Sequence, residues 1–115
     1  MKDSPLLAKS LNFAADTVLF YEDFLLLKKD NTIAKQLLRS ATSIGANLNE
    51  ATFGNSKADF ISKLHIALKE TSESLYWLQL LSKVYPQIEK LPDLLNQANE
   101  IKAMLISSLN TAKKS

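Results

Sequence analysis

The sequence predicts an all-α protein: an antiparallel up-down-up-down four-helix bundle that occupies residues 1–115 as a single domain. The composition favours helices, because Leu and Ile dominate the apolar residues and the chain has only two glycines and three prolines. Apolar residues recur three and four positions apart in four long segments, which is typical of amphipathic helices. The connections are short, so consecutive helices should be antiparallel neighbours.

The first helix is predicted over residues 5–29. Ser4 can cap its start, and Pro5 suits the first helical position, where no N–H group is needed. The apolar residues form two adjacent stripes: Leu7, Leu11, Ala14, Val18, Tyr21 and Leu25 in one, and Leu6, Phe13, Phe20, Phe24 and Leu27 in the other. An amphipathic helix needs one stripe about 100° wide, so this helix carries a surplus of apolar surface.

The second helix is predicted over residues 31–53. Its apolar face has near-ideal helical spacing and consists of Ile33, Leu37, Ala41, Ile44, Leu48 and Ala51. Gly45 lies in the middle, where glycine costs about 1 kcal/mol relative to alanine. We therefore expect the backbone of a neighbouring helix to approach Gly45 closely. Gly54 is expected to adopt the left-handed conformation that ends many helices.

The third and fourth helices are predicted over residues 57–84 and 92–111. Ser56 and Asp59 form a capping-box pattern before the third helix, and Pro92 opens the fourth. The third helix also has two apolar stripes: Phe60, Leu64, Ala67, Leu68, Thr71, Leu75 and Leu78 in the first, and Ile66, Trp77, Leu80, Leu81 and Val84 in the second. The basic segment 111–115 is expected to fray.

Composition and motifs argue against an enzyme, a metal site or a cofactor. The chain has no cysteine and one histidine, His65, so it has no thiolate nucleophile and no cysteine-bound zinc. A carboxylate-bridged di-iron bundle would need Glu-x-x-His pairs, which the sequence lacks. Glu50 is the best acid–base candidate, but we favour a structural role in which it bridges to the third helix or to another subunit. Phosphate-binding and nucleophile-elbow motifs are missing, so we expect no catalytic residues.

The sequence also predicts that the protein is cytoplasmic and does not enter a membrane. No apolar segment approaches the ~20 residues that a membrane-spanning helix requires. The N-terminal segment lacks the apolar region of a signal peptide. The absence of cysteine fits a reducing compartment.

Nucleic acid is one partner that the sequence leaves open. The candidate contacts for RNA or DNA phosphates are four basic residues: Lys35, Arg39, Lys57 and Lys63. The alternative is a solvated face of mixed charge, because Asp59, Glu70 and Glu73 interrupt the basic residues. Tyr76 and Trp77 could stack on bases, but aromatic residues at helical spacing more often belong to a core or an interface.

A second copy of the chain is the other predicted partner. The surplus apolar surface of the first and third helices predicts self-association, because large exposed apolar patches usually mark interaction surfaces. The candidate interface residues are Phe13, Phe20, Tyr76, Trp77 and Leu80.

Three short motifs in the second and third helices resemble those of one protein family. Residues 39–50 read R-S-A-T-S-I-G-A-N-L-N-E, and S-K-A-D-F and L-H-I-A follow at 56–60 and 64–67. In this order and spacing they resemble the R-x-A-x-S-I-x-x-N-I-x-E, S-x-x-[ED]-F and L-x-I-A segments of the 23S rRNA intervening-sequence proteins, a family that includes the accessory variability protein of diversity-generating retroelements. The signature polar residues are Arg39, Ser43, Asn47 and Glu50.

This resemblance implies a four-helix bundle that assembles as a barrel-shaped homopentamer without enzymatic activity or cofactor. It also implies association with RNA or DNA, since the retroelement members bind nucleic acid. Two features depart from the family pattern: Ala51 stands where many relatives have glycine, and residues 52–55 contain no arginine. We therefore expect a non-enzymatic, pentameric accessory factor associated with nucleic acid, with a protein–protein scaffold as the alternative.

Overall fold

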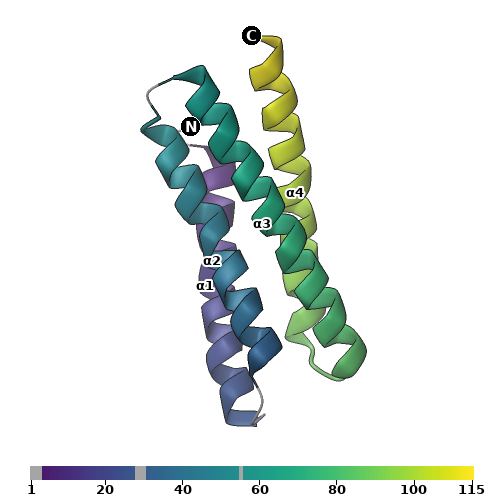
Figure 1. The fold of residues 1–115 in the computed structure, drawn as a ribbon. Coiled ribbons are helices and arrows are strands. Elements are labelled where there is room, and N and C mark those ends of the chain that lie inside the picture. Colours follow the sequence, from purple (N-terminus) through teal and green to yellow (C-terminus); the bar gives the residue numbers. More distant parts are fainter. Residues whose placement is uncertain (1–3, 28–30, 55) are drawn as a thin grey trace.

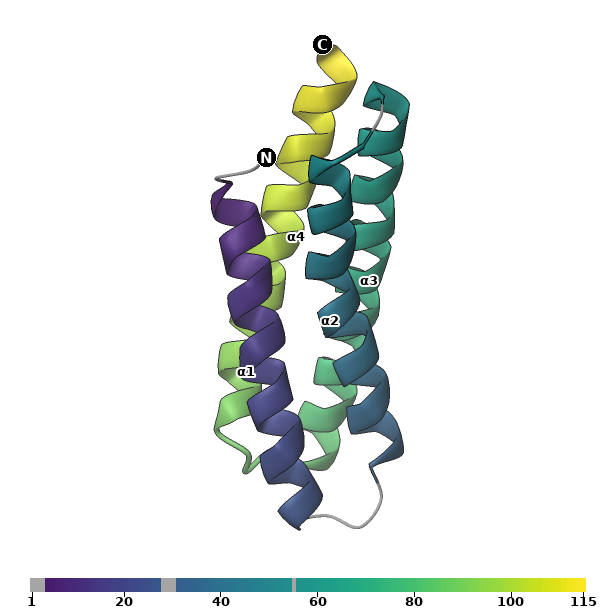
Figure 2. The ribbon, with the colours of Figure 1, turned by 90° about the vertical axis from the view of Figure 1, so that its left-hand side faces the viewer.

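The computed structural model describes residues 4–27, 31–54 and 56–115, and within them it contains four helices and no strand. The helices are α1 (Pro5–Leu27), α2 (Thr32–Thr52), α3 (Lys57–Val84) and α4 (Lys90–Lys114). Figure 1 and Figure 2 show that consecutive helices run in opposite directions along one long axis. Each helix packs against two others, α1 and α3 both contacting α2 and α4. The predicted all-α four-helix bundle is confirmed.

Side-chain caps begin two of the helices. The backbone N–H of Leu6 donates a hydrogen bond to Ser4 Oγ at 3.0 Å, so Ser4 caps α1 as predicted. Ser56 Oγ accepts from the N–H of Asp59 at 3.1 Å, which is the first half of the predicted capping box. The predicted end of the first helix, at residues 28–29, lies outside the described residues.

The ends of α4 differ from the prediction. The helix begins at Lys90, so Pro92 is its third residue and not its first; the missing N–H is still harmless there, because N–H groups of the first turn have no helical acceptor. The helix continues to Lys114, so the expected fraying of 111–115 is wrong. Leu109 is buried one turn earlier, and the positive charges of Lys113 and Lys114 complement the negative helix end.

The two glycines act through close packing. A Cβ atom at Gly45 would lie 3.7 Å from Ser10 Cβ and 3.8 Å from the Ser10 carbonyl group, so the backbone of α1 does approach Gly45 as predicted. The prediction for Gly54 is wrong, since no described glycine has a positive φ angle. A Cβ there would lie 3.3 Å from the Ala51 carbonyl oxygen, and this tight corner is the reason that a side chain fits poorly.

The core runs the length of the bundle, and the second apolar stripe of α1 enters it except for Leu27, while Leu7 and Tyr21 of the first stripe pack partly against it. The buried residues of α1 are Leu6, Ser10, Phe13, Thr17, Phe20 and Phe24. They pack with the predicted faces of the other helices, among them Leu37, Ile44, Leu64, Leu78, Ile101 and Leu105. None of the helices in the described part of the chain is both long and apolar enough to cross a membrane.

Candidate functional site

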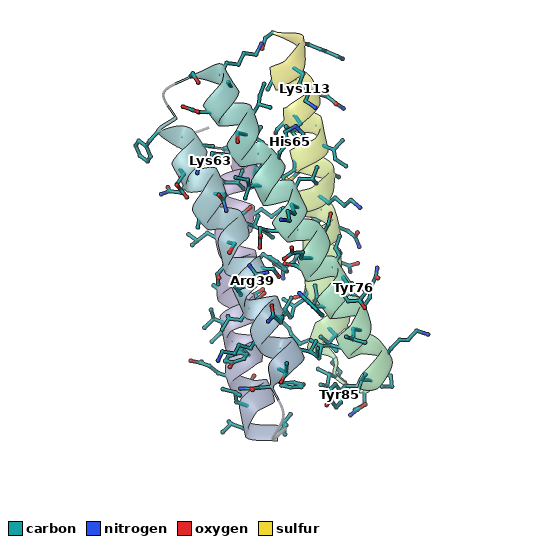
Figure 3. All side chains as sticks on the ribbon, in the orientation of Figure 1. Arg39, Lys63, His65, Tyr76, Tyr85 and Lys113 are labelled. Atoms are coloured by element: carbon teal, nitrogen blue, oxygen red, sulfur yellow. The ribbon has the colours of Figure 1, made fainter. Side chains whose placement is uncertain are left out.

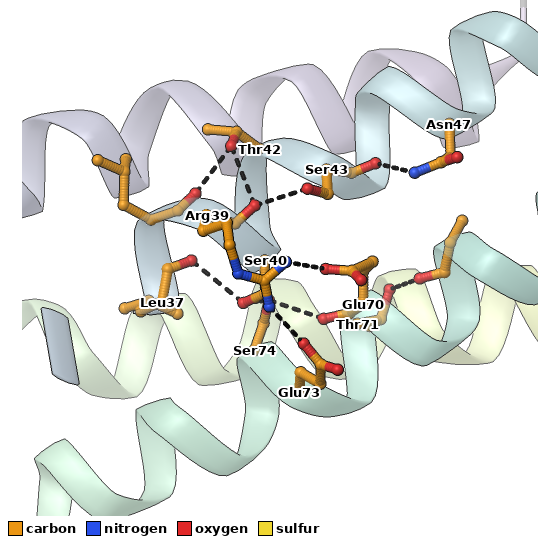
Figure 4. Close-up of polar contacts among 12 residues, drawn as sticks. Leu37, Arg39, Ser40, Thr42, Ser43, Asn47, Glu70, Thr71, Glu73 and Ser74 are labelled. Atoms are coloured by element: carbon orange, nitrogen blue, oxygen red, sulfur yellow. Dashed lines mark hydrogen bonds and ion pairs between the residues drawn. The ribbon is translucent and has the colours of Figure 1, made fainter. Parts of the chain in front are cut away.

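Three of the four signature polar residues, Arg39, Ser43 and Asn47, are shown on α2 beside α3 in Figure 4. Arg39 of α2 reaches across to α3, where Nη2 is 2.7 Å from Glu73 Oε2 and Nη1 is 3.3 Å from Glu70 Oε2. The hydrogen bond that Arg39 donates to Glu73 and the negative charges of both carboxylates raise the pKa of Arg39, although partial burial of the guanidinium acts in the opposite direction. The arginine side chain is 53% exposed, so each pair stabilises the fold by only about 0.2–1 kcal/mol.

A layer of buried hydroxyl groups lies beneath this ion pair. Ser40 Oγ of α2 and Ser74 Oγ of α3 are 2.7 Å apart, and both residues are fully buried. Ser40 Oγ is also 3.2 Å from the carbonyl oxygen of Leu37, and Ser74 Oγ is 3.0 Å from that of Glu70. The layer is therefore satisfied in either direction of the shared hydrogen bond. Because an unpaired buried hydroxyl group would be costly, the pair favours one register of α2 against α3.

The other signature residues also have partners within the chain. Ser43 Oγ donates to the carbonyl oxygen of Arg39 at 2.7 Å, and Asn47 Nδ2 donates to that of Ser43 at 2.8 Å. Glu50 Oε1 accepts from Lys63 Nζ of α3 at 3.2 Å, so Glu50 does bridge to the third helix. Arg39 and Glu50 thus join α2 to α3 at two levels, about 16 Å apart along the axis of α2 at 1.5 Å per residue.

The four predicted nucleic-acid contacts do not form one basic edge. Lys35 and Arg39 lie near the start of α2, whereas Lys57 and Lys63 lie near the start of α3, which is the opposite end of the bundle. Arg39 and Lys63 are already paired with carboxylates. In the described part of the chain, Lys35 and Lys57 are exposed and form no ion pair. The antiparallel helices therefore separate the four candidates into two groups, and their contact with nucleic acid stays a prediction.

The prediction of an interface position is wrong for two residues. Phe13 and Phe20 have exposed fractions of 0% and 5%, so the single chain already buries them. Trp77 is half-buried against the core, and Leu80 is half-buried beside it. Tyr76 is exposed and meets the Trp77 ring edge-on, with 5.1 Å between the ring centroids. These three remain available to a partner at least in part.

The surplus apolar surface lies instead on the side of α1 that faces away from the core. We call this the outer face of α1; its large apolar residues are Leu11, Val18, Leu19, Leu25 and Leu26, all of them exposed. It continues into a groove of about 270 Å³ that is lined by Leu19, Phe20, Asp23, Phe24, Leu27, Ile88 and Lys90. The exposed residues of α2, by contrast, include Lys35, Thr42, Ala46 and Asn49. One helix of the bundle therefore presents an apolar side to solvent.

Comparison with known proteins identifies the family. The sequence profile of the 23S rRNA-intervening sequence proteins matches residues 2–107. The chain belongs to this family. A protein of unknown function from the S23 ribosomal protein family of Bacteroides thetaiotaomicron, whose crystal structure is known, shares 43% sequence identity with this chain. The two structures match with a TM-score of 0.86, and the matched region covers 90% of this chain and 97% of the other. A search of the curated proteins finds no match.

Within this member of the 23S rRNA-intervening sequence protein family, Arg39 and Glu50 join α2 to α3, whereas Ser43 and Asn47 form hydrogen bonds within α2. The resemblance drew attention to Arg39, Ser43, Asn47 and Glu50, and each has an intramolecular partner. Sequence reasoning missed Ser40 and Ser74, although both occupy positions of the buried face, Ser40 three residues after Leu37 and Ser74 three after Thr71. A serine at a core position is the signal that could have revealed this pair.

Proposed function

We propose that the protein is a non-enzymatic, self-assembling helical scaffold that works as a closed homo-oligomer in the cytoplasm. The observation that carries this proposal is the exposed apolar outer face of α1. From Leu11 to Leu26 this face extends about 22 Å at 1.5 Å per residue. An apolar surface of that length on a soluble bundle usually marks a contact with another chain.

The subunit number that we propose is five, as the family resemblance implies. Light scattering coupled to size-exclusion chromatography tests it directly. At micromolar concentration we expect a mass near five times the 12.8 kDa of one chain. A mass of one chain would refute self-assembly, and another closed number would refute the pentamer while retaining the scaffold.

The absence of catalysis is part of the proposal. The best acid–base candidate, Glu50, is exposed and paired with Lys63, whereas a carboxyl group that acts as a general acid usually lies in a pocket that raises its pKa. Glu70 and Glu73 are both held by Arg39. Among the described residues, no three His, Asp or Glu side chains are placed to share a metal ion. The polar residues support helix packing, which is what a scaffold requires.

Association with RNA or DNA is the second candidate function, favoured by the charge at one end of the bundle. Figure 3 shows Lys63, His65 and Lys113 toward the end at which α4 finishes. Lys57 at the start of α3 and Lys114 in the last turn of α4 belong to the same end. In a ring of parallel subunits, these residues would form one basic rim that could contact phosphates.

Salt dependence distinguishes this function from a scaffold without nucleic acid. Oligonucleotide binding through several phosphates should weaken steeply as salt rises, because each phosphate contact releases counterions. We expect the double variant Lys113→Gln/Lys114→Gln to reduce both the affinity and this slope. The matched control is Lys35→Gln, an exposed lysine at the opposite end, near the start of α2. No binding at near-physiological salt would leave only the scaffold.

A further inference from the structure

The outer face of α1 contains one charge among its apolar residues. Glu22 is exposed and lies four residues after Val18 and three before Leu25, so it shares their side of the helix. If this face is buried between copies, as the proposed function requires, Glu22 is buried with it. A carboxylate that loses water without gaining a cation costs several kcal/mol. The surface that covers α1 should therefore supply a positive charge at that level.

A second α1 helix offers no free cation, because the lysine of α1, Lys9, is already paired with Glu100. In an antiparallel contact of two α1 helices centred on Val18, Glu22 of each copy would face the Ala14–Ala15 turn of the other. In a parallel contact, the two Glu22 carboxylates would face each other. Both symmetric arrangements leave the carboxylate without a cation, so the covering surface has to be a different face of the neighbouring copy.

The basic residues that could pair with Glu22 favour α3 as the covering helix. Within the described chain, the basic residues near the end of the bundle that holds Glu22 are Lys35, Arg39, Lys83 and Lys90. Arg39 is held by Glu70 and Glu73, and Lys90 by Asp16 and Asp93. That leaves two lysines that form no ion pair in this part of the structure.

The two lysines, Lys35 and Lys83, have different surroundings. Lys35 lies on the polar outer side of α2, with Thr42 two turns further along. Lys83 lies in the last turn of α3, next to the exposed Val84 and two turns after the exposed Tyr76. We call the surface of Tyr76, Leu80, Lys83 and Val84 the outer face of α3. It offers apolar contact and an unpaired cation together, as the outer face of α1 requires.

The positions of the two helices fit this pairing. No residue of α1 comes within 8 Å (Cα–Cα) of α3, so the two helices lie on opposite sides of the bundle. Both helices run in the same direction (Figure 2), which places Glu22 and Lys83 toward the same end. We infer that copies assemble head to tail, the outer face of α1 of one copy packing on the outer face of α3 of the next, with Glu22 paired to Lys83. Such a contact between unlike faces can close into a ring.

Cysteine cross-linking tests the inference, because the natural chain has no cysteine. Glu22→Cys and Lys83→Cys variants are refolded together and oxidised. We expect a covalent dimer that joins the two variants, little product from either variant alone, and a ladder of multimers when both cysteines are in one chain. A disulfide requires Cα atoms within about 7 Å, so residues 22 and 83 of one copy cannot form it. Lys35→Cys mixed with Glu22→Cys is the matched control and should stay uncrosslinked.

The outcomes also separate this inference from the proposed function. Cross-linking of Glu22→Cys with itself would indicate a symmetric α1 contact and overturn the inference. An intact wild-type oligomer that gives no product between positions 22 and 83 would overturn it too, while self-assembly would stand. A monomeric wild-type protein would remove both. In a second measurement, Glu22→Lys and Lys83→Glu should each weaken assembly, and the double variant should restore it.

Discussion

Removing two leucines from the outer face of α1 should dissociate the oligomer without unfolding the subunit. Leu19 and Leu26 are 59% and 86% exposed in the single chain. Complete burial of a leucine side chain stabilises by about 1.5–3 kcal/mol, so covering these exposed fractions contributes about 2–4 kcal/mol for the pair in each interface. At 1.4 kcal/mol per tenfold change, the double variant Leu19→Gln/Leu26→Gln should raise the interface Kd roughly 30- to 1,000-fold.

The fold of the double variant should be preserved. Glutamine has nearly the helix propensity of leucine, and exposed substitutions usually change the free energy of unfolding by less than about 0.5 kcal/mol. Sedimentation velocity over a wide concentration range measures assembly, and thermal melting followed by circular dichroism measures folding. The matched control is Thr42→Gln/Asn49→Gln on the exposed side of α2. An unchanged sedimentation profile would refute the assignment of the interface to α1, and so would equal dissociation of the control.

Three further predictions concern the subunit itself. Gly45→Ala should raise the free energy of unfolding by up to about 1 kcal/mol, because the added Cβ would lie at an ordinary 3.7 Å from Ser10. Gly45→Leu should instead lower the free energy of unfolding by about 1–3 kcal/mol through overpacking. Denaturant titration measures both variants, and an equal effect of the two would contradict the close contact. Phe13→Ala should cost about 3–5 kcal/mol of unfolding free energy, since Phe13 is fully buried, and a melting temperature near that of the wild type would be inconsistent with a core position. Hydrogen bonds from Lys90 and from Gln97 hold the pKa of Asp93 below its ordinary value. This carboxylate therefore stabilises the fold at pH values above the ordinary carboxyl pKa, and the contribution is lost as the pH falls through the pKa of the folded state. Lys90→Met should raise the pKa of Asp93 in an NMR titration, and an unchanged pKa would mean that Lys90 is not the cause.

The helices and their order were predictable because they depend on local patterns. Apolar spacing of three and four residues marks each helix, and the caps at Ser4 and Ser56 fix two of the starts. The end of α4 was harder, because the basic residues at 113–114 fit both a frayed tail and a stabilised helix end. The buried Leu109 and the continuing helix favour the second outcome.

Which stripe of α1 faces the core could not be decided from its sequence. Both stripes are apolar, and the buried one contains Ser10 and Thr17, which make it look the more polar of the two. The packing supplies what the sequence lacks. Thr17 Oγ1 donates to the carbonyl oxygen of Phe13 within the same helix, and the small side chain of Ser10 lets α1 approach Gly45. Thr17 is therefore satisfied when it is buried, whereas Ser10 Oγ has no hydrogen-bond partner among the described residues and its small side chain serves the close contact with Gly45.

The candidate site was predicted in part for a related reason. The family resemblance singled out Arg39 and Glu50 as signature residues, and a bridge from Glu50 to the third helix was predicted, but their partners belong to α3 and lie up to 34 residues away in the chain. Such pairs depend on the register between two helices, which sequence spacing within one helix does not define. The same limit applies to Ser40 and Ser74, whose hydroxyl groups meet only after α2 and α3 have packed.

The contact between α2 and α3 and the outer face of α1 have different roles in the chain. The ion pairs of Arg39 and Glu50 are partly solvated and add little free energy, while the buried Ser40–Ser74 pair mainly penalises other registers. Arg39, Glu50 and the Ser40–Ser74 pair therefore define how α2 and α3 fit together more than how stable the bundle is. Stability comes from the buried leucines and phenylalanines, and the outer face of α1 takes part in neither task within a single chain. A long apolar surface that takes no part in the core of the single chain supports the proposal that the protein works as an assembly of several copies.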